Sequence, residues 1–202
     1  MSRFRFLLLF IALVPVLAFS AAARADWLDD VRRGGYVIVI RHGATFSNQA
    51  DTDPLNIKNV SAQRQLNDQG RAQAKAMGEY MRKLKIPVGT VVTSMFQRAV
   101  DTGTLLGFGD VKSTFDVTEG GLVVTPDENT RRTQALRKLA GTSQPAGSNL
   151  VIVTHKPNIM DAFGKDWFDV REGEASIFQP DGQGGYKPVV RVRPDEWSSL
   201  TK

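Results

Sequence analysis

One apolar segment that ends on a charged triplet constrains the fold of this chain more than any other feature. The run from Tyr36 to Ile40 is rich in β-branched residues, follows two glycines and precedes a polar segment. Such a run is typical of a fully buried strand in a parallel sheet. It ends on Arg41, His42 and Gly43, so we expect a cation and an imidazole where an α/β sheet opens into its ligand crevice. Gly43 would let the backbone turn sharply and approach a ligand closely.

The second of the chain's two histidines repeats this arrangement. His155 ends the apolar run that begins at Leu150. A lone histidine after a strand is more often structural. Two histidines, each at the carboxyl end of a predicted core strand, point instead to one shared site.

Two longer patterns give the chain a family resemblance. Arg41-His42-Gly43, with Thr45 and Asn48 at matching offsets, resembles the signature of the histidine phosphatase superfamily, the phosphoglycerate mutase-like group, in its first branch. The segment Ser94–Thr102 resembles that family's Ser-x-x-x-Arg-Ala-x-x-Thr pattern and places Arg98 at a strand-to-helix junction. The pattern Leu66-x-x-x-Gly70-Arg71-x-x-Ala74 is also similar, although an ordinary capped helix explains it equally well. The resemblance covers roughly residues 35–194.

The resemblance implies a catalytic set built on His42 as nucleophile, with a phosphohistidine intermediate that water then hydrolyses. Arg41, Arg98 and a protonated or donating His155 would bind the phosphoryl group, and Asn48 would help to bind substrate. The planar fork of arginine suits a phosphate dianion because it bonds two oxygens at once. Adjacent cations lower the pKa of a histidine and favour the neutral, nucleophilic form. A backbone carbonyl bonded to the other ring nitrogen would fix the tautomer.

The general acid that protonates the leaving group is less clearly marked. Glu119 follows the third predicted strand, where many relatives carry a glutamate, and we assign the general acid to it. Glu128 has a structural explanation as part of a capping box that starts at Thr125. Glu174, before the predicted hairpin, is a third option. Some family members lack a positioned acid and prefer phosphohistidine or phosphoramidate substrates, and this chain could be such a case.

The sequence predicts no metal and no cofactor. It has no HxH or DxD spacing and no cysteine, which excludes thiol catalysis, disulfides and cysteine-ligated metal. The glycine-rich turn at residues 180–185 is not a phosphate cradle because no helix follows it. No lysine and arginine block or aromatic stacking platform indicates nucleic acid as a partner.

The order of elements predicts an α/β fold, a three-layer sandwich with a mostly parallel central sheet. Short strands are expected at residues 36–40, 90–94, 111–117 and 150–155, and helices after Asn67, Ser94, Thr125 and His155. A hairpin follows, with strands at residues 175–178 and 186–193. Residues 49–65 read as a long loop, expected beside the pocket where it would help to choose substrate. Lys58 and Arg64 in this loop are interpreted as solvated surface charges rather than substrate contacts.

The first 25 residues are expected to be a secretory signal peptide, which leaves one domain over residues 26–202. Arg3 and Arg5 precede an apolar run from Phe6 to Phe19, and an Ala-x-Ala site ends at Ala25. A membrane anchor is the alternative, but the run is shorter than the roughly 20 residues that span a bilayer. Cleavage would remove three arginines and no acid, lowering the formal charge from +5 to +2. The expected location is therefore secreted or periplasmic, without a stable membrane span.

The function hypothesis is a metal-independent phosphatase that hydrolyses small-molecule or envelope phosphomonoesters through His42. A mutase is a second enzymatic reading, which export disfavours because glycolytic substrates are cytosolic. A phosphate-binding or envelope-interaction domain on the same fold, without turnover, is the non-enzymatic alternative.

Overall fold

The computed structural model describes residues 27–120 and 123–201, so the predicted signal peptide of residues 1–25 lies outside the described residues. Residues 27–33 are helical and bury Trp27, Leu28 and Val31. The strands that follow are β1 (Val37–Arg41), β2 (Val88–Ser94), β3 (Val111–Thr114), β4 (Asn149–Thr154), β5 (Ala175–Pro180) and β6 (Tyr186–Val192). The longer helices are α2 (Asp68–Lys83), α3 (Gln97–Leu105), α4 (Pro126–Ala140) and α5 (Lys156–Phe163). Short 3-10 turns lie at Val60–Ala62, Phe115–Val117, Lys165–Trp167 and Trp197–Thr201.

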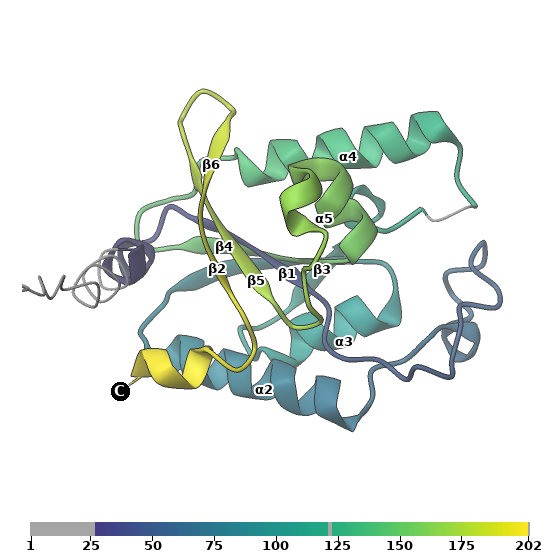
Figure 1. The fold of residues 1–202 in the computed structure, drawn as a ribbon. Helices are drawn as coiled ribbons and strands as arrows, with labels where there is room; N and C mark the ends of the chain where they lie inside the picture. The colour runs from purple at the N-terminus through teal and green to yellow at the C-terminus, as the bar shows by residue number, and fades with distance from the viewer. Residues whose placement is uncertain (1–26, 121–122, 202) are drawn as a thin grey trace, which may run out of the picture.

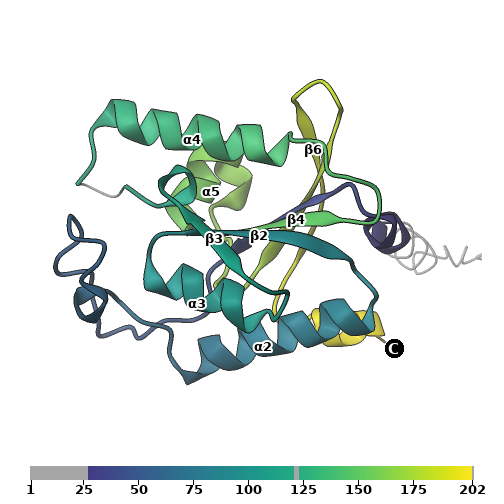
Figure 2. The ribbon, with the colours of Figure 1, turned by 180° about the vertical axis from the view of Figure 1, so that it is seen from behind.

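The strands form one sheet in the order β3-β2-β4-β1-β5-β6. The first four are mutually parallel, whereas β5 runs antiparallel to both of its neighbours. Helices α2 and α3 cover one face of the sheet and α4 and α5 cover the other (Figures 1 and 2). The predicted three-layer α/β sandwich with a mostly parallel sheet is confirmed.

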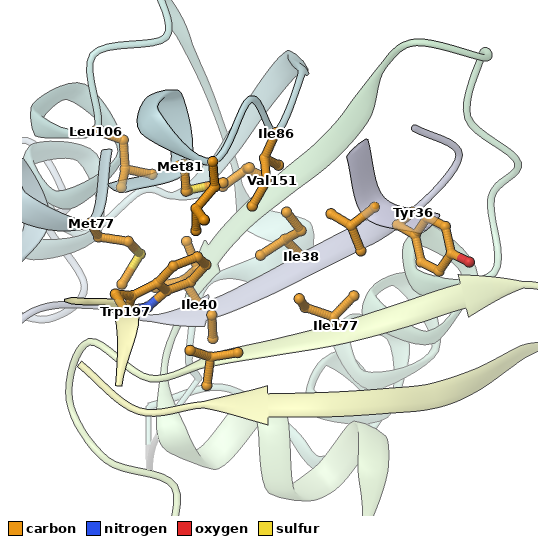
Figure 3. Close-up of a cluster of buried hydrophobic side chains, with 14 of the residues drawn as sticks. Tyr36, Ile38, Ile40, Met77, Met81, Ile86, Leu106, Val151, Ile177 and Trp197 are labelled. Atoms are coloured by element: carbon orange, nitrogen blue, oxygen red, sulfur yellow. The ribbon is translucent and has the colours of Figure 1, made fainter. Parts of the chain in front are cut away.

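Strand β1 divides its side chains between two cores because successive residues point to opposite faces of a sheet. Ile38 and Ile40 pack with Met77 and Met81 of α2, in the cluster drawn in Figure 3. Val37 and Val39 join the other cluster, which includes residues of α4 and α5. All five side chains from residue 36 to residue 40 are buried, which is why the strand reads as a continuous apolar run.

The predicted helix starts are found where the capping residues indicated. The Asn67 side chain accepts a hydrogen bond from the Gly70 amide, and Thr125 accepts one from the Glu128 amide. One strand is shorter than expected, because β3 ends at Thr114 and the Thr114 side chain caps the 3-10 turn that follows. An edge strand with two exposed residues has too little apolar surface to extend further.

The parallel strands end together at one edge of the sheet, where the site lies. Arg41 at the end of β1 is in register with Thr154 at the end of β4, and Thr93 of β2 pairs with Val153. The residues that follow these strands are His42, His155 and the start of α3. Among the described residues no helix is both long and apolar enough to cross a membrane.

Candidate active site

The two histidines meet at the carboxyl edge of the sheet. Their ring centroids are 5.1 Å apart with the planes inclined at 61°. A hydrogen bond from the His42 amide to the Thr154 carbonyl, 3.0 Å long, continues the pairing of β1 with β4 beyond the strands. Both rings are almost fully buried. The sequence expectation that strand ends bring these residues together is therefore met in the structure.

His42 is held as a neutral imidazole with one free nitrogen. The pKa of His42 is lowered to about 3. Burial is the largest cause and the nearby guanidinium of Arg98 the second, while the hydrogen bond to the Gly43 carbonyl acts in the opposite direction. Nδ1 lies 2.8 Å from that carbonyl, which can only accept, so we assign the ring proton to Nδ1. Nε2 is then left with a lone pair at neutral pH.

Arg98 is the fully buried cation of the cluster. It sits in the first turn of α3, and its terminal nitrogens bond to Asp51 at 2.9 Å and to Glu119 at 2.8 Å. Phe96 flanks the guanidinium, 4.4 Å from its carbon to the ring centroid. Burial raises the pKa of Glu119, Arg98 opposes that shift, and the neighbouring Asp51 adds to it.

His155 is also neutral, since burial and then Arg98 lower its pKa well below the ordinary value. Of the two expected forms of His155, protonated or donating, this environment favours the uncharged, donating ring. Nε2 lies 2.7 Å from the Ser94 hydroxyl, while Nδ1 lies 3.6 Å from a Glu119 carboxylate oxygen.

Arg41, the last residue of β1, contributes a second guanidinium to the cluster. One terminal nitrogen donates to the Val170 carbonyl at 2.8 Å, and the other lies 3.5 Å from Glu172. The Thr45 hydroxyl donates to the same carboxylate at 2.9 Å. Glu172 thus connects two residues of the Arg-His-Gly segment.

Buried nitrogens without a partner gather in this cluster. Among the described residues they include His155 Nδ1 and the Nε atoms of Arg41, Arg64 and Arg98. Buried donors normally have a hydrogen-bond partner, so a buried donor without one indicates a place where a ligand could accept the hydrogen bond. Four such nitrogens around two neutral imidazoles describe a site that accepts an anion.

Arg64 belongs to this group, which corrects its interpretation as a solvated charge. Its side chain is half-buried, and its charge lowers the pKa of His42, His155 and Arg41. Lys58 is exposed, as expected. Loop 49–65 lies beside the site, as predicted, and Asp51 anchors it by bonding to both Arg98 and the Arg64 amide.

The other predicted residues lie outside the anion site. Asn48 is exposed in a turn and has no side-chain hydrogen bond to the cluster. Glu128 bonds to Arg131 and Arg132 of its own helix, and the buried Glu174 bonds to Arg191. Within the described ranges no three His, Asp or Glu side chains lie close enough together to hold a metal ion.

Four members of the cluster were not assigned to the site from the sequence, namely Asp51, Arg64, Glu172 and the hydroxyl of Ser94. Ser94 was noted only as the start of a motif. Asp51 and Arg64 come from the aperiodic loop, where nothing local distinguishes a site residue from a surface charge. One weak signal could have placed Arg64 near the site. It lies three residues before the Asn67 cap, and the cap fixes where the loop ends.

Comparison with known proteins gives a family match and a shared fold. Residues 37–119 match the model of the histidine phosphatase superfamily (branch 1). The protein histidine phosphatase SixA, solved with tungstate, is 15% identical with a TM-score of 0.55, over 80% of this chain and 98% of that one. A phosphoserine phosphatase from Entamoeba histolytica, solved with phosphoserine, is 15% identical with a TM-score of 0.53, over 79% and 97%. A mycobacterial glucosyl-3-phosphoglycerate phosphatase, solved with VO3, is 17% identical with a TM-score of 0.53, over 77% and 97%. No curated protein sequence matches this chain significantly.

Proposed function

We propose that this chain, whose residues 37–119 match the histidine phosphatase superfamily (branch 1), is a member of that family and hydrolyses phosphomonoesters through a phosphohistidine formed on His42. The observation that carries the proposal is the group of four buried nitrogens without a hydrogen-bond partner. One belongs to His155, whose ring meets that of His42, and three belong to arginines whose charges act on His42. Structural relatives were solved with phosphoserine, tungstate and VO3, all tetrahedral or phosphate-like oxyanions. Those ligands support a phosphoryl group as the anion that this site receives.

His42 Nε2 attacks phosphorus while the ester oxygen leaves on the opposite side. The ring needs no prior deprotonation, because its pKa of about 3 keeps it neutral at physiological pH. The Gly43 carbonyl stabilises the Nδ1 proton as positive charge develops on the ring. Water then attacks the phosphohistidine, which releases inorganic phosphate and restores the neutral imidazole.

The phosphoryl oxygens bind to Arg41, Arg98 and the Nδ1–H of His155, and Arg64 supplies further positive charge. Donors that are fixed before the reaction stabilise the charge that develops in the transition state. Arg98 offers its free Nε, because Asp51 and Glu119 already occupy its terminal nitrogens. Asp51 thereby links the loop at residues 49–65 to the phosphate-binding arginine.

Glu119 protonates the leaving oxygen, since burial raises the pKa of this carboxyl group and favours its protonated form. One observation favours a second candidate function, a phosphoramidate or phosphohistidine phosphatase. The 2.8 Å bond from Arg98 stabilises the ionised form of Glu119, which cannot donate a proton. A substrate with a good leaving group would not need that proton.

The test compares the purified wild-type protein with His42→Ala and Glu119→Gln. Wild type should hydrolyse p-nitrophenyl phosphate, and an alkali-stable, acid-labile phosphoenzyme should be trapped on quenching. His42→Ala should lose both signals, with turnover reduced at least about 1,000-fold. Glu119→Gln should slow an alkyl phosphate about 100-fold and an aryl phosphate much less.

Full activity in His42→Ala would refute the nucleophile assignment. If Glu119→Gln hydrolyses both the alkyl and the aryl phosphate at the wild-type rate, the phosphoramidate reading is favoured. Binding of orthovanadate without any turnover or phosphoenzyme would instead favour a phosphate-binding domain. Circular dichroism of each variant establishes that a loss of activity is not a loss of fold.

A further inference from the structure

Exposed apolar side chains gather at one end of the molecule. Leu55 is 81% exposed, Phe115 47% and Val123 42%, and all three line the same pocket. They come from the loop at 49–65, the turn after β3 and the segment before α4. Figures 1 and 2 both place that loop and the chain before α4 at the end of the molecule where the parallel strands finish. Large apolar groups left in water on three converging segments indicate a surface that a ligand covers.

The pocket shares lining residues with the phosphate site. Its volume is about 110 Å³, and Ile57 and Phe96 contribute further apolar wall. Glu119 lines the pocket and bonds to Arg98, so one carboxyl group borders both spaces. The Phe96 ring meets the His155 ring edge-on, with centroids 5.5 Å apart.

We propose that this pocket receives the organic group of the substrate, and that the substrates are phosphomonoesters of apolar alcohols or phenols. The inference rests on the proposed function. An ester oxygen that takes its proton from Glu119 must lie beside that carboxyl group. The carbon attached to this oxygen then enters the pocket that Glu119 borders.

The chemistry of the walls selects against a polyhydroxylated group. Apart from Glu119, the one charged side chain of the pocket is Arg132. Its guanidinium already donates to Glu128 and to the Thr118 carbonyl. Sugar hydroxyls would lose water and find few partners there, which is costly. The volume is smaller than the roughly 150 Å³ of a cavity that holds benzene, so a short alkyl chain fits within the pocket and an aryl ring would extend out of its mouth.

A second, larger space is the competing location for the organic group. It measures about 540 Å³ beside Ala44 and is lined by polar side chains, including Gln73, Glu172 and Asp195. A sugar phosphate would use that space, since it offers many hydrogen-bonding groups. The two locations predict opposite preferences between apolar and polar substrates.

The experiment measures binding of a series of n-alkylphosphonates, from methyl to hexyl, and of phenylphosphonate, by titration calorimetry with the wild-type protein. Phosphonates are not hydrolysed, so binding does not depend on turnover. Affinity should rise about two- to fourfold with each methylene until the chain fills the pocket. Leu55→Ser and Phe115→Ser should flatten this dependence and leave methylphosphonate affinity unchanged. Val60→Ser is the matched control, an exposed apolar residue of the same loop that does not line the pocket.

Affinity that is independent of chain length would overturn the inference, as would an unchanged slope in both pocket variants. Tighter binding of a glucose 6-phosphonate analogue than of hexylphosphonate would do the same and would favour the space beside Ala44. The failure of the proposed function looks different. In that case p-nitrophenyl phosphate is not hydrolysed and no phosphoenzyme forms, while the chain-length dependence persists.

Discussion

At the scale of single residues, Ser94 influences which ring nitrogen of His155 carries the proton. The Phe96 amide donates to the Ser94 oxygen at 3.1 Å, so the hydroxyl hydrogen is free to point at His155 Nε2, 2.7 Å away. We infer that the hydroxyl donates to Nε2, which places the ring proton on Nδ1, an atom without a hydrogen-bond partner among the described residues. The hydroxyl therefore converts a neutral histidine into a donor aimed at phosphate.

Replacing Ser94 by Ala should lower kcat for p-nitrophenyl phosphate about tenfold, the effect of one lost hydrogen bond. The His155 ring would then divide its proton between both nitrogens, so Ser94→Thr should restore the rate. Ser176→Ala is the matched control, because Ser176 is a buried strand serine that accepts a bond from Trp167. Steady-state kinetics check the prediction, and wild-type kcat in Ser94→Ala would contradict it.

Whether a site residue could be predicted from the sequence depended on whether it lies near the end of a strand or in a loop. Arg41 ends β1, His42 and His155 directly follow β1 and β4, and Arg98 lies in the first turn of the helix after β2. Strand ends of a parallel sheet share an edge, so the apolar pattern of these strands was enough to bring the four residues together. Ser94 ends its own strand, but a hydroxyl there has many structural explanations. Asp51 and Arg64 depend on the path of a loop, which tertiary contacts determine and local sequence does not.

At the scale of elements, two glycines hold the loop after β1 against the start of α2. A Cβ on Gly70 would lie 2.0 Å from the Ala44 carbonyl oxygen, and one on Gly43 would lie 2.7 Å from the Gly70 carbonyl oxygen. The Asn67 amide and side chain also donate to the carbonyls of Ala44 and Thr45. Gly43 therefore serves backbone packing against a helix, whereas the sequence reading assigned it to close approach of a ligand.

Gly70→Ala should move the segment that carries His42 and lower kcat about 10- to 100-fold, because small displacements of a reacting group are costly. The overpacked contact should also cost about 1–3 kcal/mol of stability. Gly78→Ala is the control, since its Cβ would come equally close to the Leu106 carbonyl, at 2.0 Å, away from the site. Urea unfolding should show similar losses in both variants, while kinetics should show the activity loss in Gly70→Ala alone. Equal kcat in the two variants would refute the positioning role.

Most elements were predictable because caps and apolar periodicity agree with their packing. The helix after Asn67 was expected from its cap, and the residues that α2 buries include Ala74, Met77 and Met81, spaced three and four apart on one helical face. The order of strands in the sheet was not predictable, because β4 inserts between β1 and β2 through contacts far apart in sequence. The end of β3 was misjudged because a hydroxyl cap at Thr114 outweighs the alternating apolar residues Phe115 and Val117 that follow.

At the scale of the whole molecule, the site is a buried charge cluster placed at the edge of the sheet. The guanidinium groups of Arg41 and Arg98 lie beside three carboxylates, those of Glu172, Asp51 and Glu119, whereas Arg64 contacts Asp51 through its main-chain amide. The two imidazoles add no charge at neutral pH, since burial and the arginines keep both rings unprotonated. The native fold therefore excludes two protons that the unfolded chain would bind in mild acid.

The free energy of unfolding should consequently fall as the pH drops below the ordinary histidine value of 6.5. Between that value and the native pKa of about 3 for His42, the unfolded state binds more protons than the native state. Each buried histidine then removes up to about 1.4 kcal/mol per pH unit. Glu119 acts in the opposite direction, because its raised pKa makes the native state bind a proton more readily. The measurement is urea unfolding of wild type, His42→Asn and Glu119→Gln at about pH 7 and about pH 5. The pH dependence should be shallower in His42→Asn and steeper in Glu119→Gln, and the same slope in wild type and His42→Asn would show that His42 binds its proton equally in both states.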